Sequence, residues 1–144
     1  VGLMGIVADA VMEQQGEVFG IIPQFLLDRE VGHNKITRLE VVQSMHQRKQ
    51  RMADLANAFI ALPGGWGTLE EVAEILTWRQ LGLITQPVIL LNVQGFFSPL
   101  IQQLQLMFEE GFVRKEHIDN LKIATTPAEA LSLIIPRDGL KDSL

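Results

Sequence analysis

Cysteine is absent from the 144 residues, so disulfides, thiolate zinc sites and a cysteine nucleophile are excluded within them. This absence is compatible with a reducing compartment, and we expect a cytoplasmic protein. Long apolar runs are lacking as well. No window reaches the roughly 18 to 20 consecutive apolar residues that a membrane-spanning helix requires. The sequence therefore predicts no membrane partner.

Basic residues are in the minority. Twelve Lys and Arg stand against 17 Asp and Glu, a formal net charge of −5, and the basic residues form no long run. A general electrostatic attraction to nucleic acid is therefore disfavoured, and any bound anion must be held locally. With 47% hydrophobic and 20% charged residues, the composition is that of a folded domain with one core.

Segments with helical apolar spacing alternate with short apolar runs typical of strands. This order predicts an α/β fold with a doubly wound, mainly parallel sheet and helices on both faces. Helices are expected over residues 6–15, 44–55, 68–81 and 99–110 and from Pro127 onward, and strands over residues 17–23, 58–62, 87–92 and 122–125. A single domain is expected over residues 1–136, with a frayed tail over 137–144.

Two further features concern the first third of the chain. The chain opens on the Gly-punctuated stretch Val1-Gly2-Leu3-Met4-Gly5 without an initiator Met, so we expect the N-terminal part of the domain to be missing. Residues 24–37 form the longest expected loop. Long ordered loops are often functional, and a mobile surface loop is the alternative.

Three glycines, Gly64, Gly65 and Gly67, join an expected strand to an expected helix. Glycine permits positive φ and close approach of a ligand, and the first N–H groups of a helix favour an anion. Thr68 adds a hydroxyl at the expected helix cap. The alternative is a plain connecting turn. No Lys follows the glycines, and Glu70 stands where the dinucleotide fingerprint has its third glycine, so an ordinary NTPase or NAD site is not expected.

The helix after the glycines carries acidic residues at regular spacing. At about 100° per residue, Glu70, Glu74 and Thr77 lie near one line, away from the apolar side that contains Val72 and Leu76. Acidic residues in a first helical turn are ordinarily explained by the helix dipole. Beside a phosphate site a carboxylate is costly unless a developing positive charge gains from it, so we expect Glu70 to face a site.

A basic pair interrupts another expected helix. Met45, Met52 and Leu55 predict its inward stripe, and Arg48 and Lys49 occupy positions within that stripe. Either their long stems extend to the rim, or an anion meets them, with Arg as a forked donor and Lys as a point charge.

Other chemistry finds little support in the sequence. The three histidines, His33, His46 and His117, have no metal-binding spacing, and we expect no metal. No nucleophilic serine motif appears, and Lys49 has no cofactor signature around it that would mark a Schiff-base lysine. We expect no cofactor.

Two segments carry a resemblance. Met45-His46-Gln47-Arg48-Lys49, followed by Pro63-Gly64-Gly65-Trp66-Gly67-Thr68-Leu69-Glu70-Glu71, is similar to the motifs of the Lonely Guy (LOG) family. The resemblance implies a Rossmann-like α/β fold, usually in a homodimer with sites near the subunit interface. It also implies hydrolysis of nucleoside 5′-monophosphates to free base and ribose 5-phosphate. The characteristic substrates are cytokinin riboside monophosphates, and some members accept AMP.

The resemblance also implies roles for individual residues. The motif arginine and glutamate fall on Arg48 and Glu70, the expected catalytic residues, and Trp66 takes the place of the tyrosine often found in the family. The expected substrate-binding residues are Glu30, Lys49, Gly64, Gly65, Trp66, Gly67, Thr68 and Thr77. The main alternative is a carrier that holds a phosphate-bearing ligand without hydrolysing it, similar to the molybdenum-cofactor carrier proteins.

Overall fold

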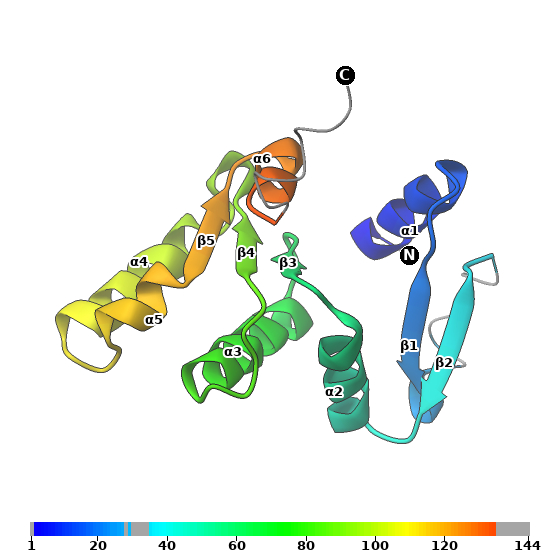
Figure 1. The fold of residues 1–144 in the computed structure, drawn as a ribbon, viewed down its shortest axis with the longest axis horizontal. Coiled ribbons are helices and arrows are strands. Elements are labelled where there is room, and N and C mark those ends of the chain that lie inside the picture. Colours follow the sequence, from blue (N-terminus) through cyan, green and yellow to red (C-terminus); the bar gives the residue numbers. More distant parts are fainter. Residues whose placement is uncertain (1, 28, 30–34, 135–144) are drawn as a thin grey trace, which may run out of the picture. The chain divides into compact units, whose positions relative to one another are not determined.

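A computed structural model describes residues 2–27, 29 and 35–134 of the chain. These residues belong to two compact units, Val1–Leu55 (unit 1) and Ala56–Leu144 (unit 2). Each unit is described by itself (Figure 1). The single domain expected over residues 1–136 stays a prediction, and the expected tail over 137–144 lies outside the described residues. Within the described part, no helix is both long enough and apolar enough to cross a membrane.

Unit 1 contains a parallel pair of strands. Its elements are α1 (Leu3–Glu13), β1 (Phe19–Pro23), the 3-10 turn η1 (Gln24–Leu26), β2 (Arg38–Val42) and α2 (Met45–Leu55). In the parallel register Phe19 faces Arg38 and Ile21 faces Glu40. The expected helices and the expected strand of this part are confirmed within three residues at each end.

Strand β2 was not expected from the sequence. It follows the long loop, and its five residues, Arg-Leu-Glu-Val-Val, alternate between charged and apolar side chains. That alternation is the signal of a strand with one polar and one apolar face, but it is too short to stand out beside a polar loop. The η1 turn also falls inside the expected loop, because three residues after Pro23 close a tight turn.

Helix α2 begins where Ser44 can cap it. The Ser44 hydroxyl accepts a hydrogen bond from the Gln47 N–H (3.1 Å), and Gln47 Oε1 accepts one from the Gln43 N–H (2.8 Å). This reciprocal arrangement satisfies N–H groups that have no partner within a helix. The cap therefore fixes where the basic segment of α2 starts.

Unit 2 has three parallel strands in the order β3-β4-β5. The strands are β3 (Phe59–Ala61), β4 (Val88–Leu91) and β5 (Leu121–Ala124). The helices are α3 (Trp66–Gln80), α4 (Ser98–Glu109), α5 (Lys115–Asp119) and α6 (Pro127–Ser132), with the 3-10 turn η2 (Val93–Gly95) between β4 and α4. Helix α5 was not expected, because five residues are too few to show helical periodicity.

The sheet of unit 2 is covered on both faces. Alternate side chains of β4 point to opposite faces, and all four are buried. Ile89 and Leu91 join Ala124 and Ala130 of α6 in one core cluster. On the other face Leu90 packs with Val72 of α3 and with Phe97, the residue before α4, in a second cluster. The α/β fold with parallel strands that alternate with helices is therefore confirmed.

Asn92 connects β4 to the start of α4. Its backbone N–H donates to the Ala124 carbonyl (2.7 Å), its side-chain Oδ1 accepts from the Phe97 N–H (2.7 Å), and its Nδ2 donates to the Ser98 hydroxyl (3.1 Å). Between these anchors, Gln94 and Gly95 adopt positive φ values of 52° and 73°. One amide side chain thus closes the loop between a buried strand and its following helix.

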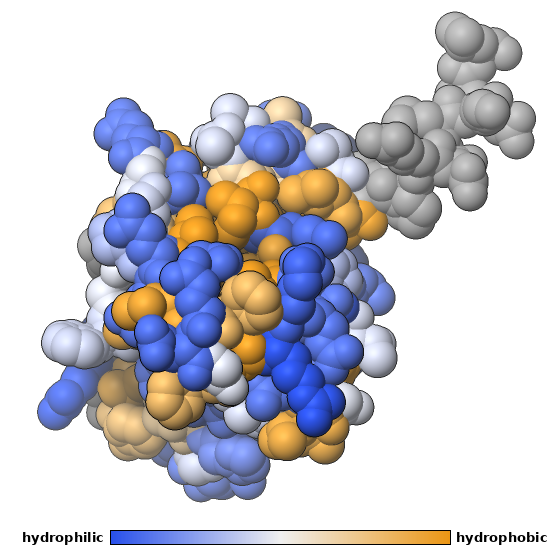
Figure 2. All heavy atoms as spheres, turned by 90° about the vertical axis from the view of Figure 1, so that its left-hand side faces the viewer, coloured by the Kyte–Doolittle hydropathy of each residue, from blue (hydrophilic) through white to orange (hydrophobic). Residues whose placement is uncertain are grey.

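The side of the molecule on which α4 and α5 lie in Figure 1 is shown in Figure 2, where apolar side chains gather among hydrophilic ones. In this part of unit 2, Leu106 is 47% exposed and Phe112 is 81% exposed. Single exposed apolar side chains are common on protein surfaces and do not by themselves mark an interface. The expected homodimer therefore stays a prediction.

Helix α6 supplies a prediction about pH. Thr126 Oγ1 accepts from the Glu129 N–H (3.2 Å), and Glu129 Oε2 accepts from the N–H (2.8 Å) and hydroxyl (3.0 Å) of Thr125. The Thr125 backbone bond, followed by its side-chain bond, lowers the pKa of Glu129. A lowered pKa stabilises the fold above the pKa of the unfolded chain, and this contribution is lost as the pH falls through the folded value.

We therefore expect Glu129→Gln to lower the melting temperature at pH 7. The difference from the unsubstituted protein should shrink as the pH falls below 4.5, the ordinary value for glutamate, and through the lowered pKa of Glu129. Thermal unfolding followed by circular dichroism between pH 7 and pH 3.5 measures this. Glu17→Gln is the control, because Glu17 is exposed and outside the helices and strands. A difference in melting temperature that is constant across this range would contradict the prediction.

Candidate functional site

The glycine turn lies in unit 2 between β3 and α3. Helix α3 starts at Trp66, two residues before the expected start, and its N-cap is Gly65. Leu69 makes the first helical bond, its N–H donating to the Gly65 carbonyl at 3.1 Å. The expectation that Thr68 is the cap is therefore wrong: Thr68 is the third residue of the helix. The turn and the first N–H groups of α3 nevertheless adjoin, as an anion site requires.

The three positions of the turn are occupied by glycine for different structural reasons. None of them has a positive φ, so the turn does not use this freedom of glycine. A Cβ on Gly64 would lie 2.2 Å from the Thr68 hydroxyl oxygen. Gly64 is therefore needed because the side chain of Thr68 folds back against it.

Gly65 and Gly67 face open space. A Cβ built on either would meet nothing within 4 Å. Neither glycine is required by contacts within the described part of the chain, which leaves room for a ligand beside the helix start. Trp66, between them, is 87% exposed, so its indole does not pack in a core.

Glu70 lies on the exposed side of α3. Its side chain is exposed, whereas Val72, two residues later, is buried in the core. Because α3 starts at Trp66, Glu70 is the fifth helical residue and lies beyond the first turn. The dipole of a helix favours acids mainly within that turn, so the dipole alone does not account for Glu70. Side chains in a helix lean toward its N-terminus, which for Glu70 is the end at the glycine turn.

Thr77 lies two turns further along the same helix. Its hydroxyl donates to the Ala73 carbonyl (2.8 Å), a bond common for threonine within helices. It is exposed, and its oxygen retains acceptor capacity. At 1.5 Å per residue it lies roughly 13 Å beyond Thr68 along the helix axis. A contact of Thr77 with the same ligand stays a prediction.

Arg48 and Lys49 lie on α2 in unit 1, and both are half-buried. The expected inward stripe of α2 is wrong at Met52 and Leu55, which are 41% and 45% exposed. The stripe fails because the sheet face beside α2 carries charged residues of β2 as well as apolar residues of β1. An ion pair therefore takes part of the place of apolar packing there.

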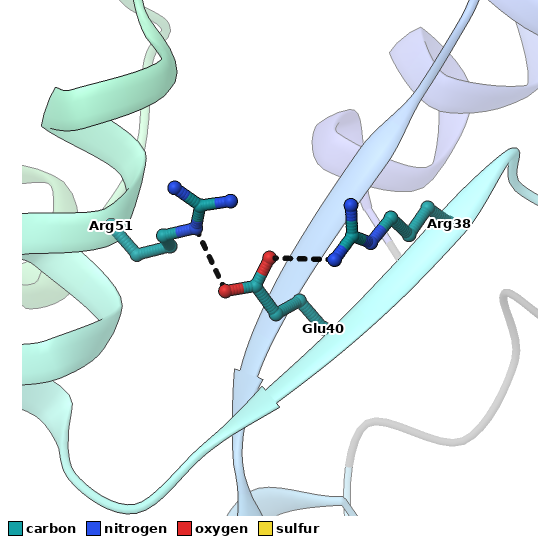
Figure 3. Close-up of polar contacts among 3 residues, drawn as sticks. All are labelled: Arg38, Glu40 and Arg51. Carbon is teal, nitrogen blue, oxygen red and sulfur yellow. Dashed lines mark hydrogen bonds and ion pairs between the residues drawn. The ribbon is translucent and has the colours of Figure 1, made fainter.

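That ion pair was not expected from the sequence. Glu40 of β2 accepts a hydrogen bond from Arg51 Nε of α2 at 2.8 Å, and its other oxygen lies 3.6 Å from an Nη of Arg38 (Figure 3). A shallow hollow beside these side chains is also lined by Phe19, Ile21 and Leu55. The spacing of 11 residues between Glu40 and Arg51 crosses two elements, so it gives no local sequence signal.

The expected residues thus fall into two groups. Unit 2 brings together the glycine turn, Trp66, Thr68 and Glu70 at the start of α3, and unit 1 holds Arg48 and Lys49 on α2. Glu30 lies outside the described residues. Among the residues that the structure describes, no group of three or more His, Asp or Glu could hold a metal ion.

Comparison with known proteins identifies the family. A family model described as "Possible lysine decarboxylase" matches residues 4–134. The chain belongs to the Lonely Guy (LOG) family. Similar proteins include the probable cytokinin riboside 5′-monophosphate phosphoribohydrolase LOGL2 of Oryza sativa subsp. japonica, 45% identical over 131 residues, which are 91% of this chain and 54% of that protein.

Two further LOG proteins show the same relation. The cytokinin riboside 5′-monophosphate phosphoribohydrolase LOG of Oryza sativa subsp. japonica is 47% identical over 81% of this chain and 48% of its own length. The enzyme LOG2 of Arabidopsis thaliana is 50% identical over 78% of this chain and 53% of its own length. The chain therefore spans about half the length of the LOG proteins that it matches.

The glycines of this LOG-family turn give a paired prediction. Gly67→Ala is expected to leave the free energy of unfolding unchanged or to raise it by about 0.5–1 kcal/mol, because alanine suits a helix and its Cβ meets no atom. Gly64→Ala is expected to lower it by about 1–3 kcal/mol, because Thr68 must move. Urea unfolding measures both values. Equal destabilisation by the two variants would contradict the described turn.

Proposed function

We propose that the protein hydrolyses the N-glycosidic bond of nucleoside 5′-monophosphates and releases the free base and ribose 5-phosphate. Its LOG relatives bear the names of cytokinin riboside 5′-monophosphate phosphoribohydrolases, which supports cytokinin riboside monophosphates as substrates. AMP is proposed beside them as a second substrate of the same class. The observation that carries the proposal is the open space at Gly65 and Gly67, at the start of the helix that carries the exposed Glu70.

The glycine turn is proposed to hold the 5′-phosphate. The first N–H groups of α3 lack helical partners, and the positive end of the helix dipole lies there. Gly65 and Gly67 allow a phosphate oxygen to approach the backbone without meeting a side chain. Thr68 adds a hydroxyl, which Gly64 allows to lie against the turn.

Glu70 is proposed to act at the ribose. Cleavage of the bond between C1′ and the base nitrogen leaves oxocarbenium character on the sugar, which a carboxylate stabilises. The same carboxylate orients or deprotonates the water whose oxygen joins C1′, while a proton goes to the departing base. Glu70 follows Trp66 by four residues, about 6 Å along the helix axis, so a sugar attached to a phosphate at the turn reaches it.

The remaining expected residues complete the proposal. Arg48 is proposed as a forked donor to the substrate and Lys49 as a point charge near its phosphate. Glu30, Trp66 and Thr77 are proposed as further substrate contacts, with the Trp66 indole beside the base. A homodimer or larger homo-oligomer is proposed as the working form, and light scattering of the purified protein measures it.

Base release from a matched panel tests the function. Cytokinin riboside 5′-monophosphate, AMP and the corresponding nucleosides without phosphate are incubated with the full protein, and the free base is measured by chromatography. We expect release from at least one monophosphate and a kcat/KM lower by about 100-fold or more for its nucleoside, because charge-assisted contacts to phosphate are lost. Equal rates with and without the phosphate would contradict the proposed role of the turn. Binding of the monophosphate without base release would favour the carrier alternative.

A further inference from the structure

Glu40 links two elements of unit 1. It lies on β2, and its carboxylate accepts a hydrogen bond from Arg51 Nε on α2 at 2.8 Å (Figure 3). The side chains of Glu40 and Arg51 are 25% and 36% exposed, so the pair is partly shielded from water. A charge-assisted hydrogen bond of this length is directional. It therefore joins α2 to β2 in a defined direction.

The apolar contacts of α2 are less directional than this bond. The buried residue of this helix is Ala53, whose small methyl group makes few contacts that would resist a rotation of the helix. The large apolar side chains of Met52 and Leu55 are 41% and 45% exposed. Apolar contacts have no preferred direction, whereas the Glu40–Arg51 bond has one.

The bond lies close to the proposed ligand-binding residue Arg48. Residues three apart share a side of a helix, and Arg48 precedes Arg51 by three. Side chains extend about 5–6 Å from the helix axis, so a rotation of about 20° moves their ends by about 2 Å. A misplacement of about 1 Å already costs up to 100-fold in a positioned site.

We propose that Glu40 is a positioning residue that, through Arg51, holds the side of α2 bearing Arg48 in the orientation that binds the nucleotide phosphate or sugar. This inference rests on the proposed function. Glu40 itself does not touch the substrate, and its negative charge would repel a phosphate. Its contribution is the bond to Arg51.

The direction in which one substitution changes ligand binding distinguishes a positioning role of Glu40 from a purely electrostatic one. Glu40→Gln removes a negative charge from the face near a bound anion. If Glu40 acts only through its charge, or if Arg51 itself contacts the phosphate, the substitution tightens binding because it removes a repulsion and releases Arg51. If Glu40 positions α2, the substitution weakens binding, because a neutral amide holds Arg51 less strongly.

The experiment measures KM and kcat for a nucleoside 5′-monophosphate with the full protein. We expect Glu40→Gln and Arg51→Ala each to raise KM by about 5–10-fold, because they misplace Arg48 rather than remove its bond to the ligand, and the double variant to raise it no further. Arg51→Lys, which retains a charge that can reach Glu40, should return KM most of the way toward the unsubstituted value. An unchanged or lowered KM for Glu40→Gln would overturn the proposal.

Arg38 provides the matched control. It is an arginine near the same carboxylate, at 3.6 Å, but it lies on β2 with Glu40 and cannot link the helix to the strand. Arg38→Ala should therefore leave KM unchanged, although it removes the same charge as Arg51→Ala. Thermal unfolding of all variants is measured alongside. A KM rise equal for Arg38→Ala and Arg51→Ala would indicate a charge effect and would overturn the proposal.

The proposed function and the positioning role of Glu40 are contradicted by different results. If the unsubstituted protein releases no base from any monophosphate, the proposed function is wrong, and the role of Glu40 in substrate binding falls with it. If the unsubstituted protein is active and Arg51→Ala has the same KM, only the positioning role is wrong.

Discussion

Replacing Glu70 with Gln is expected to lower kcat for base release by about 100- to 10,000-fold, the usual contribution of a general base or acid. Glutamine has nearly the same shape but neither stabilises a developing positive charge nor accepts a proton from water. Because the phosphate is proposed to bind the turn rather than Glu70, KM should change little. Steady-state kinetics with a nucleoside 5′-monophosphate measure both constants.

Glu71→Gln is the control for this substitution. Glu71 is the next residue of α3 and points about 100° away around the helix. The Glu71→Gln variant should retain nearly full kcat, because the proposed chemistry needs only the carboxylate on the side of the helix where Glu70 lies. A Glu70→Gln variant with normal kcat, or a Glu71→Gln variant with the larger loss, would remove Glu70 from the proposed role.

Replacing Arg48 with Ala is expected to raise KM for the nucleoside 5′-monophosphate by about 10- to 100-fold. Hydrogen bonds to a charged group contribute about 1.5–3 kcal/mol, and this range of KM corresponds to that loss. Arg48→Lys should recover only part of it, because lysine lacks the planar fork of the guanidinium. The dephosphorylated nucleoside should be affected less than the monophosphate if Arg48 binds the phosphate.

The alternative for Arg48 makes a different prediction. If its stem merely extends along the surface toward water, Arg48→Ala changes stability slightly and leaves KM unchanged. Arg114→Ala is a control for the general loss of positive charge, since the Arg114 side chain is 84% exposed. A fall in kcat at constant KM would move Arg48 from phosphate binding to assistance of the departing base.

Most of the fold could be predicted from the sequence because its apolar runs are distinct. Residues 88–91 are four apolar residues after a proline, and they form the strand buried on both faces. The elements that were missed are short. Helix α5 has five residues and β2 alternates only twice, so neither has a period long enough to be recognised.

The candidate site likewise has parts that the sequence predicts and parts that it does not. Glu70 and the glycine turn are local in sequence, so their proximity on α3 was expected. The structural reasons for the glycines were not expected. Gly64 is required by its contact with the Thr68 side chain, which no local sequence pattern predicts. The Glu40–Arg51 bond joins a strand to a helix, and only the fold brings these residues together.

Because Asn92 anchors the loop after β4, changes within this loop should not disturb β4 or α4. Both ends of that loop are held by one amide, through the N–H of Phe97 and the hydroxyl of Ser98, while residues 93–96 are exposed. Extra residues inserted between these anchors would project into water without pulling on either neighbouring element. This short segment is consequently a suitable point for grafting a fluorescent label or an epitope tag.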